Sequence, residues 1–206
     1  MLSTRTWSWI AEPGCKVTVT NPTDAELVRA CLAGQRDAFD LLVERHQRHV
    51  YQLCYRFVGN HEDASDLAQD VFIRAYRALA TFKGDASLGT WLYRIAVNTS
   101  LNKVGSKTPR PIALDPLIAA SDQRLTSAGE DAAEAILRAE RSGQVRAAIA
   151  RLPRKQRTTL ILRVFHELPH EEIAGILGSS VGAVKANFFH ALHNLKKLMR
   201  EAGFDR

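Results

Sequence analysis

Apolar residues recur along most of this chain at steps of three and four, which is the spacing of one face of an α-helix. The alternation of apolar and polar residues that predicts strands is not found in any segment. Capping residues, glycines and prolines divide the pattern into eight expected helices. These cover residues 23–32, 37–58, 60–79, 88–103, 134–152, 153–165, 169–178 and 180–198. We therefore predict an all-α protein without internal repeats.

Each long helix carries an apolar stripe that should face a core. In residues 60–79 the stripe consists of Ala64, Leu67, Ala68, Val71, Phe72, Ala75 and Leu79. The residues expected to face inward from 153–165 are Leu160, Ile161, Val164 and Phe165. Those expected to face inward from 180–198 are Val181, Val184, Phe188, Leu192, Leu195 and Leu198.

Two segments lack this periodicity. Residues 105–133 combine three prolines with Ser, Gly and Asp, which predicts a flexible linker between two small helical domains. The domains would be an N-terminal helical bundle at 23–104 and a second helical domain at 134–206. Residues 1–22 contain two prolines and a glycine, and we expect them to form a poorly ordered extension.

The second domain contains a helix-turn-helix pattern. Pro169 is suited to open its first helix, Gly178 to end it, and Ser179 or Ser180 to cap the next helix. In this motif the second helix enters the major groove of DNA. Its solvent side would carry Lys185, Ala186, Asn187, Phe189, His190, His193, Asn194, Lys196 and Lys197.

These residue types suit DNA recognition, because lysine pairs with phosphate or guanine, asparagine with adenine, and an exposed ring with a thymine methyl group. The alternative is an ordinary solvated helix face, with Phe189 covered by a neighbouring helix. The distribution of charge favours DNA. Residues 141–206 hold 12 Lys and Arg against 5 Asp and Glu, whereas residues 1–104 hold 12 against 11. The excess positive charge therefore lies in the domain with the helix-turn-helix, as a polyanion-binding module requires.

Other classes of protein are disfavoured. Cys15, Cys31 and Cys54 are widely spaced and include no CxxC pair, which favours reduced thiols in a cytoplasmic protein and no metal site. The chain lacks a run of 18 apolar residues and a secretory h-region, so we expect neither membrane insertion nor export. No pattern in the sequence calls for a cofactor.

Three stretches, at residues 63–98, 152–178 and 180–192, together resemble the bacterial RNA polymerase sigma factors of the extracytoplasmic-function (ECF) subfamily. They read DASDLAQDVFIRAYRALATFKGDASLGTWLYRIAVN, LPRKQRTTLILRVFHELPHEEIAGILG and SVGAVKANFFHAL. The resemblance implies two helical domains. The first would bind core polymerase and the minus-ten promoter element, and the second would read the minus-thirty-five element. It also implies an anti-sigma factor as a partner.

By this resemblance the polymerase contact includes Asp66, Gln69, Asp70 and Arg74. The first three lie at i, i+3 and i+4, so a helix places them on one patch. An acidic patch is poorly suited to phosphate and well suited to a basic protein surface. The alternative is a solvated face whose Asp70 pairs internally with Arg74, an interaction of small energy.

The minus-ten element would be held by aromatic, cationic and polar side chains, which suit unstacked bases. The residues are Phe82, Lys83, Ser87, Thr90, Trp91, Tyr93, Arg94 and Asn98. By resemblance, the loop TFKGDAS would receive a flipped base. Trp91 also belongs to an apolar stripe with Leu88 and Leu92, which favours a core position for its ring. These residues only bind, so we expect no catalysis by this chain.

Two competing interpretations remain. Residues 166–170 match the zinc-protease pattern HExxH, but Pro169 disfavours the continuous helix that such a site needs. The other is a helix-turn-helix transcriptional regulator without sigma activity, which would not need the 63–98 segment. The recognition helix also has Asn187 and His190 where sigma relatives often carry arginine, so the promoter sequence cannot be taken from relatives.

Overall fold

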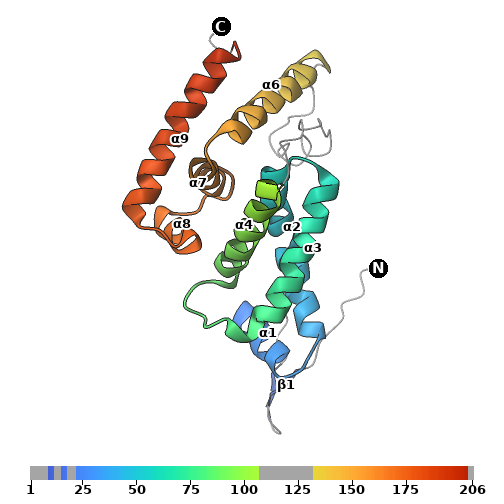
Figure 1. Cartoon of the computed structure of the whole chain (residues 1–206). Coiled ribbons are helices and arrows are strands. Elements are labelled where there is room, and N and C mark those ends of the chain that lie inside the picture. The colour runs from blue at the N-terminus through green and yellow to red at the C-terminus, as the bar shows by residue number, and fades with distance from the viewer. Residues whose placement is uncertain (1–8, 12–14, 18–21, 107–131, 204–206) are drawn as a thin grey trace.

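The computed structural model of the protein describes residues 9–11, 15–17, 22–106 and 132–203, and these residues are mostly helical (Figure 1). The first half contains α1 (Asp24–Leu32), α2 (Asp37–Val58), α3 (His61–Ala78), a 3-10 turn at Leu79–Thr81 and α4 (Leu88–Ser106). The second half contains α6 (Ala132–Arg151), α7 (Arg154–Phe165), α8 (His170–Leu177) and α9 (Val181–Glu201). The prediction of an all-α fold is confirmed. The prolines of the predicted linker lie outside the described residues.

A short antiparallel hairpin precedes the helices. It pairs β1 (Trp9–Ala11) with β2 (Cys15–Val17), and Ile10 lies opposite Lys16. The expectation of no strand was therefore wrong at this hairpin. Strands of three residues are too short to produce a recognisable alternation in the sequence.

Local hydrogen bonds set the helix ends where the sequence predicts them. Thr23 and Glu26 form a capping box at α1, and the Asp63 N–H donates to the Asn60 side chain (2.8 Å) at α3. Ser180 caps α9 by accepting from the Ala183 N–H (3.2 Å). Gly178 ends α8 with a left-handed φ of 58°, a conformation in which glycine avoids the clash of a Cβ.

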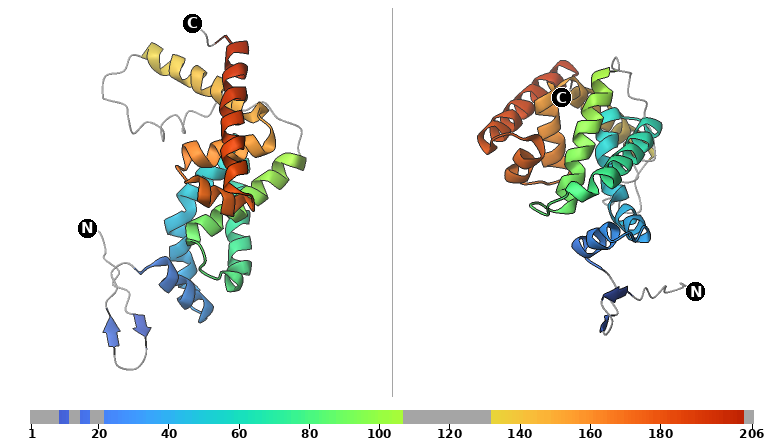
Figure 2. Two further views of the ribbon diagram at one scale, coloured as in Figure 1. Left: turned by 90° about the vertical axis from the view of Figure 1, so that its left-hand side faces the viewer. Right: turned by 60° about the horizontal axis from the view of Figure 1, so that its bottom comes forward.

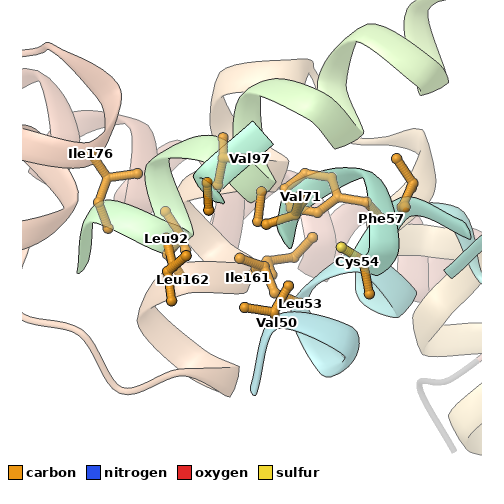
Figure 3. Packing of buried hydrophobic residues seen from close by; sticks show 14 of the residues in the cluster. Val50, Leu53, Cys54, Phe57, Val71, Leu92, Val97, Ile161, Leu162 and Ile176 are labelled. Carbon is orange, nitrogen blue, oxygen red and sulfur yellow. The ribbon is translucent and has the colours of Figure 1, made fainter. Parts of the chain in front are cut away.

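The two halves share one hydrophobic core (Figure 3). In the first half the α3 stripe is buried as predicted against α2, which contributes Leu53, Cys54 and Phe57. Leu160, Ile161 and Leu162 of α7 belong to the same cluster. The helix α8 also lies against α4, so the halves are in direct contact (Figures 1 and 2). The sequence predicted two domains but not this contact.

The helix α7 is buried on several sides, and this changes the predicted pattern. Six consecutive residues are buried, from Arg157 to Leu162, whereas Val164 is exposed despite the prediction that it faces inward. A helix enclosed by neighbours has no solvent-facing stripe over its enclosed turns, so periodicity cannot identify its buried positions.

The stripe on α9 also differs at one position. Ala191 is buried, whereas Leu192, which was expected to face inward, is 45 % exposed. Leu192 fits the three- and four-residue spacing as well as Ala191 does. The direction in which α9 crosses α7 determines which of these two neighbours is buried, and the spacing of apolar residues does not contain this information.

The shared core predicts the effect of shortening Leu162. Leu162→Ala leaves a cavity where the side chain is fully buried, and we expect it to lower the free energy of unfolding by about 2–5 kcal/mol. Urea unfolding followed by circular dichroism measures this change. We also expect one cooperative transition, because Leu162 belongs to the cluster that both halves form.

Val164→Ala on the same helix is the matched control. Its side chain is 49 % exposed, so its cost should stay below about 1 kcal/mol. Equal costs for the two variants, or two separate transitions in the parent protein, would contradict the shared core.

Candidate nucleic-acid and protein interfaces

The predicted polymerase-binding residues form an exposed patch on α3. Asp66, Gln69, Asp70 and Arg74 are all exposed. Lys103 of α4 approaches the edge of this patch, with its Nζ 4.0 Å from Asp66 and 3.1 Å from Asp63. Within the described part of the chain, no ion pair joins Asp70 to Arg74. The internal pairing considered for this patch therefore involves Lys103 rather than Arg74.

A groove runs beside the patch, between α2 and α3. Its volume is about 640 Å³, and Gln69 and Ile73 of α3 line it together with Gln47 and Arg48 of α2. Ile73 and Tyr76 are each 49 % exposed. Sequence reasoning missed this apolar component, although Ile73 lies outside the α3 stripe and so could have been noticed. The patch and the groove together form a surface that is acidic on one side and apolar on the other.

The start of α4 holds several of the predicted minus-ten residues in structural contacts. Ser87 caps the helix, because the Thr90 N–H donates to its hydroxyl oxygen (3.0 Å). The rings of Phe82 and Trp91 lie 5.4 Å apart, and both pack against the core. The indole of Trp91 is thus half-buried, as its place in the apolar stripe predicts. Phe82 and Trp91 thus support this loop from the core side, and Ser87 fixes its junction with α4.

The remaining predicted minus-ten residues fall into two groups. Lys83, Arg94 and Asn98 are exposed. In contrast, the Thr90 hydroxyl donates to Glu172 of α8 (3.0 Å), and the Tyr93 hydroxyl lies 3.1 Å from Nδ1 of His166 at the end of α7. The second group is therefore engaged by the C-terminal half.

The solvent side of α9 is largely as predicted. Lys185, Ala186, His190, Lys196 and Lys197 are exposed, and Asn187 is half-buried. Phe189 is 68 % exposed, so it is not covered by a neighbouring helix of the described chain. This apolar and cationic face meets the chemical needs of contacts to base edges and phosphates.

Two other residues, Asn194 of α9 and His170 of α8, form contacts within the C-terminal half. The Asn194 amide, which was expected on the solvent side, donates to Gln156 Oε1 of α7 (2.8 Å). The ring of His170 packs edge-on against Phe188, with 5.7 Å between the centroids. These contacts hold α9 against α7 and α8.

The HExxH pattern does not form a metal site. His166 follows the last residue of α7, Glu167 has a positive φ of 54°, and Pro169 is the N-cap of α8. His166 thus lies at the end of α7 and His170 at the start of α8, so the two histidines do not lie one turn apart on a continuous helix. No cluster of three metal-binding side chains occurs among the described residues.

His166 instead lies half-buried between the halves, with its ring against Tyr93 of α4. Burial, and then electrostatic interaction with Arg56 and His49, lower the pKa of its imidazole to about 4. Burial also raises the pKa of the Tyr93 hydroxyl. The neutral imidazole shares a hydrogen bond with the Tyr93 hydroxyl through Nδ1, and its tautomer sets which of the two groups donates.

Two family models match the chain. Residues 42–109 match Sigma-70 region 2, and residues 142–195 match Sigma-70 region 4. The first match covers most of the α2–α4 bundle, and the second extends from α6 into α9. In the described ranges, no helix is long and apolar enough to cross a membrane.

The chain is also similar in sequence to bacterial sigma factors. The RNA polymerase sigma-H factor of Pseudomonas aeruginosa is 39 % identical over 193 residues, which are 89 % of this chain and 100 % of that protein. The ECF RNA polymerase sigma factor SigW of Bacillus subtilis is 35 % identical over 173 residues, with coverage of 82 % and 92 %. A co-crystal structure of the sigma factor RpoE with the anti-sigma factor NepR from Bartonella quintana has a similar fold. It shows 20 % identity, a TM-score of 0.55 and coverage of 82 % of this chain and 98 % of that chain.

The burial of His166 predicts how stability depends on pH. An unfolded chain protonates this imidazole near its ordinary pKa of 6.5, whereas the folded chain keeps it neutral down to about pH 4. Between these values the unfolded state binds more protons than the folded state. The contribution of His166 to the free energy of unfolding should therefore be fully present above about pH 6.5 and should be lost as the pH falls toward 4. His166→Gln should flatten the decrease, as denaturant titrations between pH 7 and pH 5 can measure.

His190→Gln is the control, because His190 is exposed on α9. This variant should keep the pH dependence of the parent protein. If His166→Gln and His190→Gln show the same slope against pH, the burial of His166 between the halves is not the cause.

Proposed function

Because this chain belongs to the ECF subfamily of bacterial RNA polymerase sigma factors, we propose that its two helical halves divide the recognition of core polymerase and promoter DNA. The chain binds core RNA polymerase and directs promoter-specific initiation of transcription. We assign a region-2-like domain to residues 23–104 and a region-4-like domain to residues 134–206. The observation that supports the division is the exposure of two chemically different surfaces, one on α3 and one on α9.

The contact with core polymerase is assigned to the α2–α3 surface. Asp66, Gln69 and Asp70 provide carboxylates and an amide at its acidic side, while Arg74 extends the polar stripe by one turn. The adjoining groove and the exposed Ile73 provide apolar area that a charged patch alone would lack. A helical partner surface with basic and apolar side chains suits this combination.

The minus-ten element is assigned to the loop before α4 and to the exposed side of that helix. Lys83, Arg94 and Asn98 can reach phosphates and bases directly, because they are exposed. Phe82 and Trp91 support the loop from the core side, and Ser87 fixes its junction with the helix. Strand opening needs only binding energy here, since phosphodiester chemistry belongs to the polymerase, so we assign no catalytic role to the chain.

The minus-thirty-five element is assigned to α9. Phe189 is available for apolar contact with a thymine methyl group, and Lys185 lies one turn before it. Asn187 and His190 provide polar readout, while Lys196 and Lys197 are placed further along the helix for phosphate contacts.

Engagement of the minus-ten element requires the two halves to separate. Thr90 and Tyr93 form hydrogen bonds with Glu172 and His166 when the two halves are in contact, which we call the closed arrangement. Their hydroxyl groups are then not available to DNA. An anti-sigma factor that binds both halves could stabilise this arrangement. The co-crystal structure of a relative with an anti-sigma factor supports such a partner, and we place the chain with polymerase in the cytoplasm.

Transcription by a reconstituted enzyme tests the function. Core RNA polymerase with this chain should start transcripts at a specific subset of promoters in a genomic template library, whereas core alone should not. Start-site mapping then identifies the promoter elements. If no specific start is found although the chain binds duplex DNA, a helix-turn-helix regulator without sigma activity becomes the better description.

Reversing the acidic patch tests the polymerase contact. Asp66→Arg combined with Asp70→Arg should abolish association with core polymerase, because it places four units of opposite charge on the proposed contact surface. Both side chains are exposed, so the helices should stay folded. Co-purification with core measures binding, and circular dichroism measures folding.

Glu171→Arg combined with Glu201→Arg makes the same change of net charge on exposed residues of the C-terminal helices. This control should keep most of the affinity for core. Loss of binding in both double variants would indicate a nonspecific charge effect, and retention in both would remove the α3 patch from the contact.

A further inference from the structure

One glycine of α9 is not required by the fold of the described chain. Gly182 lies exposed in the first turn of this helix, and its φ is not positive, so any residue can adopt its backbone conformation. A Cβ added at Gly182 would have no neighbouring atom within 4 Å. Glycine is also less favourable than alanine in a helix, because it loses more conformational freedom on folding. The fold therefore has room for a side chain here and gains nothing from its absence.

Gly182 lies on the side of α9 that the proposed function assigns to DNA. Residues three, four and seven positions apart share one side of a helix. That side of α9 continues from Gly182 to Lys185, Ala186 and Phe189, which are all exposed. The ring of Phe189 is 68 % exposed and lies two turns further along the helix than the glycine. The start of α9, next to α8 in Figure 1, thus presents a cation and a ring beside a position without a side chain.

A second glycine provides a comparison, because it has the same free space in a different charge environment. Gly175 of α8 is exposed, and a Cβ there would also have no neighbouring atom within 4 Å. Gly175 follows Glu171 and Glu172 by four and three residues, so it shares their acidic side of the helix. Carboxylates repel phosphates, whereas Lys185 near Gly182 attracts them. Charge complementarity with DNA therefore favours Gly182 over Gly175 as a point of contact.

We propose that Gly182 is a specificity-determining residue, whose missing side chain lets the wall of the major groove approach the backbone of α9 closely. The molecule that approaches is the sugar–phosphate backbone of the promoter duplex. This inference rests on the proposed function, because α9 is the helix assigned there to the minus-thirty-five element. A methyl group at Gly182 would hold the first turn of α9 away from the duplex.

Such a separation affects two kinds of contact differently. Contact of Phe189 with a thymine methyl group and of Lys185 with a base edge requires short distances. Phosphate contacts by long, flexible side chains such as Lys196 and Lys197 tolerate a small displacement and do not depend on sequence. A side chain at Gly182 should therefore weaken recognition of the promoter sequence more than general affinity for DNA.

Gly182→Ala in the reconstituted polymerase tests this proposal. Core polymerase carrying the parent chain or the variant is titrated with two labelled promoter duplexes. One duplex contains the minus-thirty-five element found by start-site mapping, and the other contains a scrambled element. The variant should bind the first duplex at least about tenfold more weakly, which corresponds to the loss of about one base contact. Its affinity for the scrambled duplex should stay unchanged.

Urea unfolding of the free chain separates this effect from a damaged fold. Gly182→Ala should leave the urea midpoint equal or higher, because alanine is the better helix former and has free space at this position. Weaker promoter binding together with a lower midpoint would overturn the proposal, because the fold itself would then require the glycine.

Gly175→Ala is the matched control. It makes the same change at an exposed helix position with free space, and it should leave the affinity for both duplexes unchanged. The proposal is overturned if Gly182→Ala binds both duplexes like the parent, or if both alanine variants lose promoter affinity equally. Failure of the proposed function gives a different result, because the parent polymerase itself would then not distinguish the two duplexes, and the inference would fail with it.

Discussion

Burial of α7 between the two halves is the constraint on which the rest of this structure depends. Leu160, Ile161 and Leu162 are all buried, although three consecutive residues of a helix point in different directions. Neighbouring elements must therefore enclose this helix, and the core cluster joins it to α2 and α4. Each of these side chains contributes about 1.5–3 kcal/mol when it is fully removed from water. The closed arrangement thus rests mainly on apolar area.

Polar contacts then fix which surfaces meet. Tyr93 and Thr90 of α4 bond to His166 and Glu172 across the junction. Such bonds contribute about 0.5–1.5 kcal/mol each, so they select an alignment more than they provide stability. The same alignment leaves the α3 patch and the outer face of α9 exposed. The proposed contacts with polymerase and with the minus-thirty-five element are therefore exposed, while part of the proposed minus-ten surface is covered.

The charges at the junction make this closure conditional. Arg56 and Arg157 lie at the contact between the halves, and the partial burial of His166 there keeps its imidazole neutral near pH 7. Apolar burial favours closure, whereas the cost of removing polar groups from water opposes it. A protein that must release its DNA-binding surfaces to function can use such a balance, because modest changes in charge or partner then shift the equilibrium.

The sequence by itself determined the helices, most of their ends and the outer faces. Caps at Thr23, Asn60 and Ser180 depend on residues three apart, and the α3 stripe depends on helical periodicity. Both features are therefore determined by short segments of the sequence. The exposed face of α9 followed from the same periodicity, and the break at Pro169 from proline geometry.

Only the tertiary structure decided which surfaces meet. It covered Thr90 and Tyr93, exposed Leu192 in place of Ala191, and brought Arg56, Arg146 and Arg157 around one cavity. These outcomes depend on how helices far apart in the chain cross and fit together. Packing of that kind is set by the combined shape of two surfaces, and no pattern within a single segment encodes it.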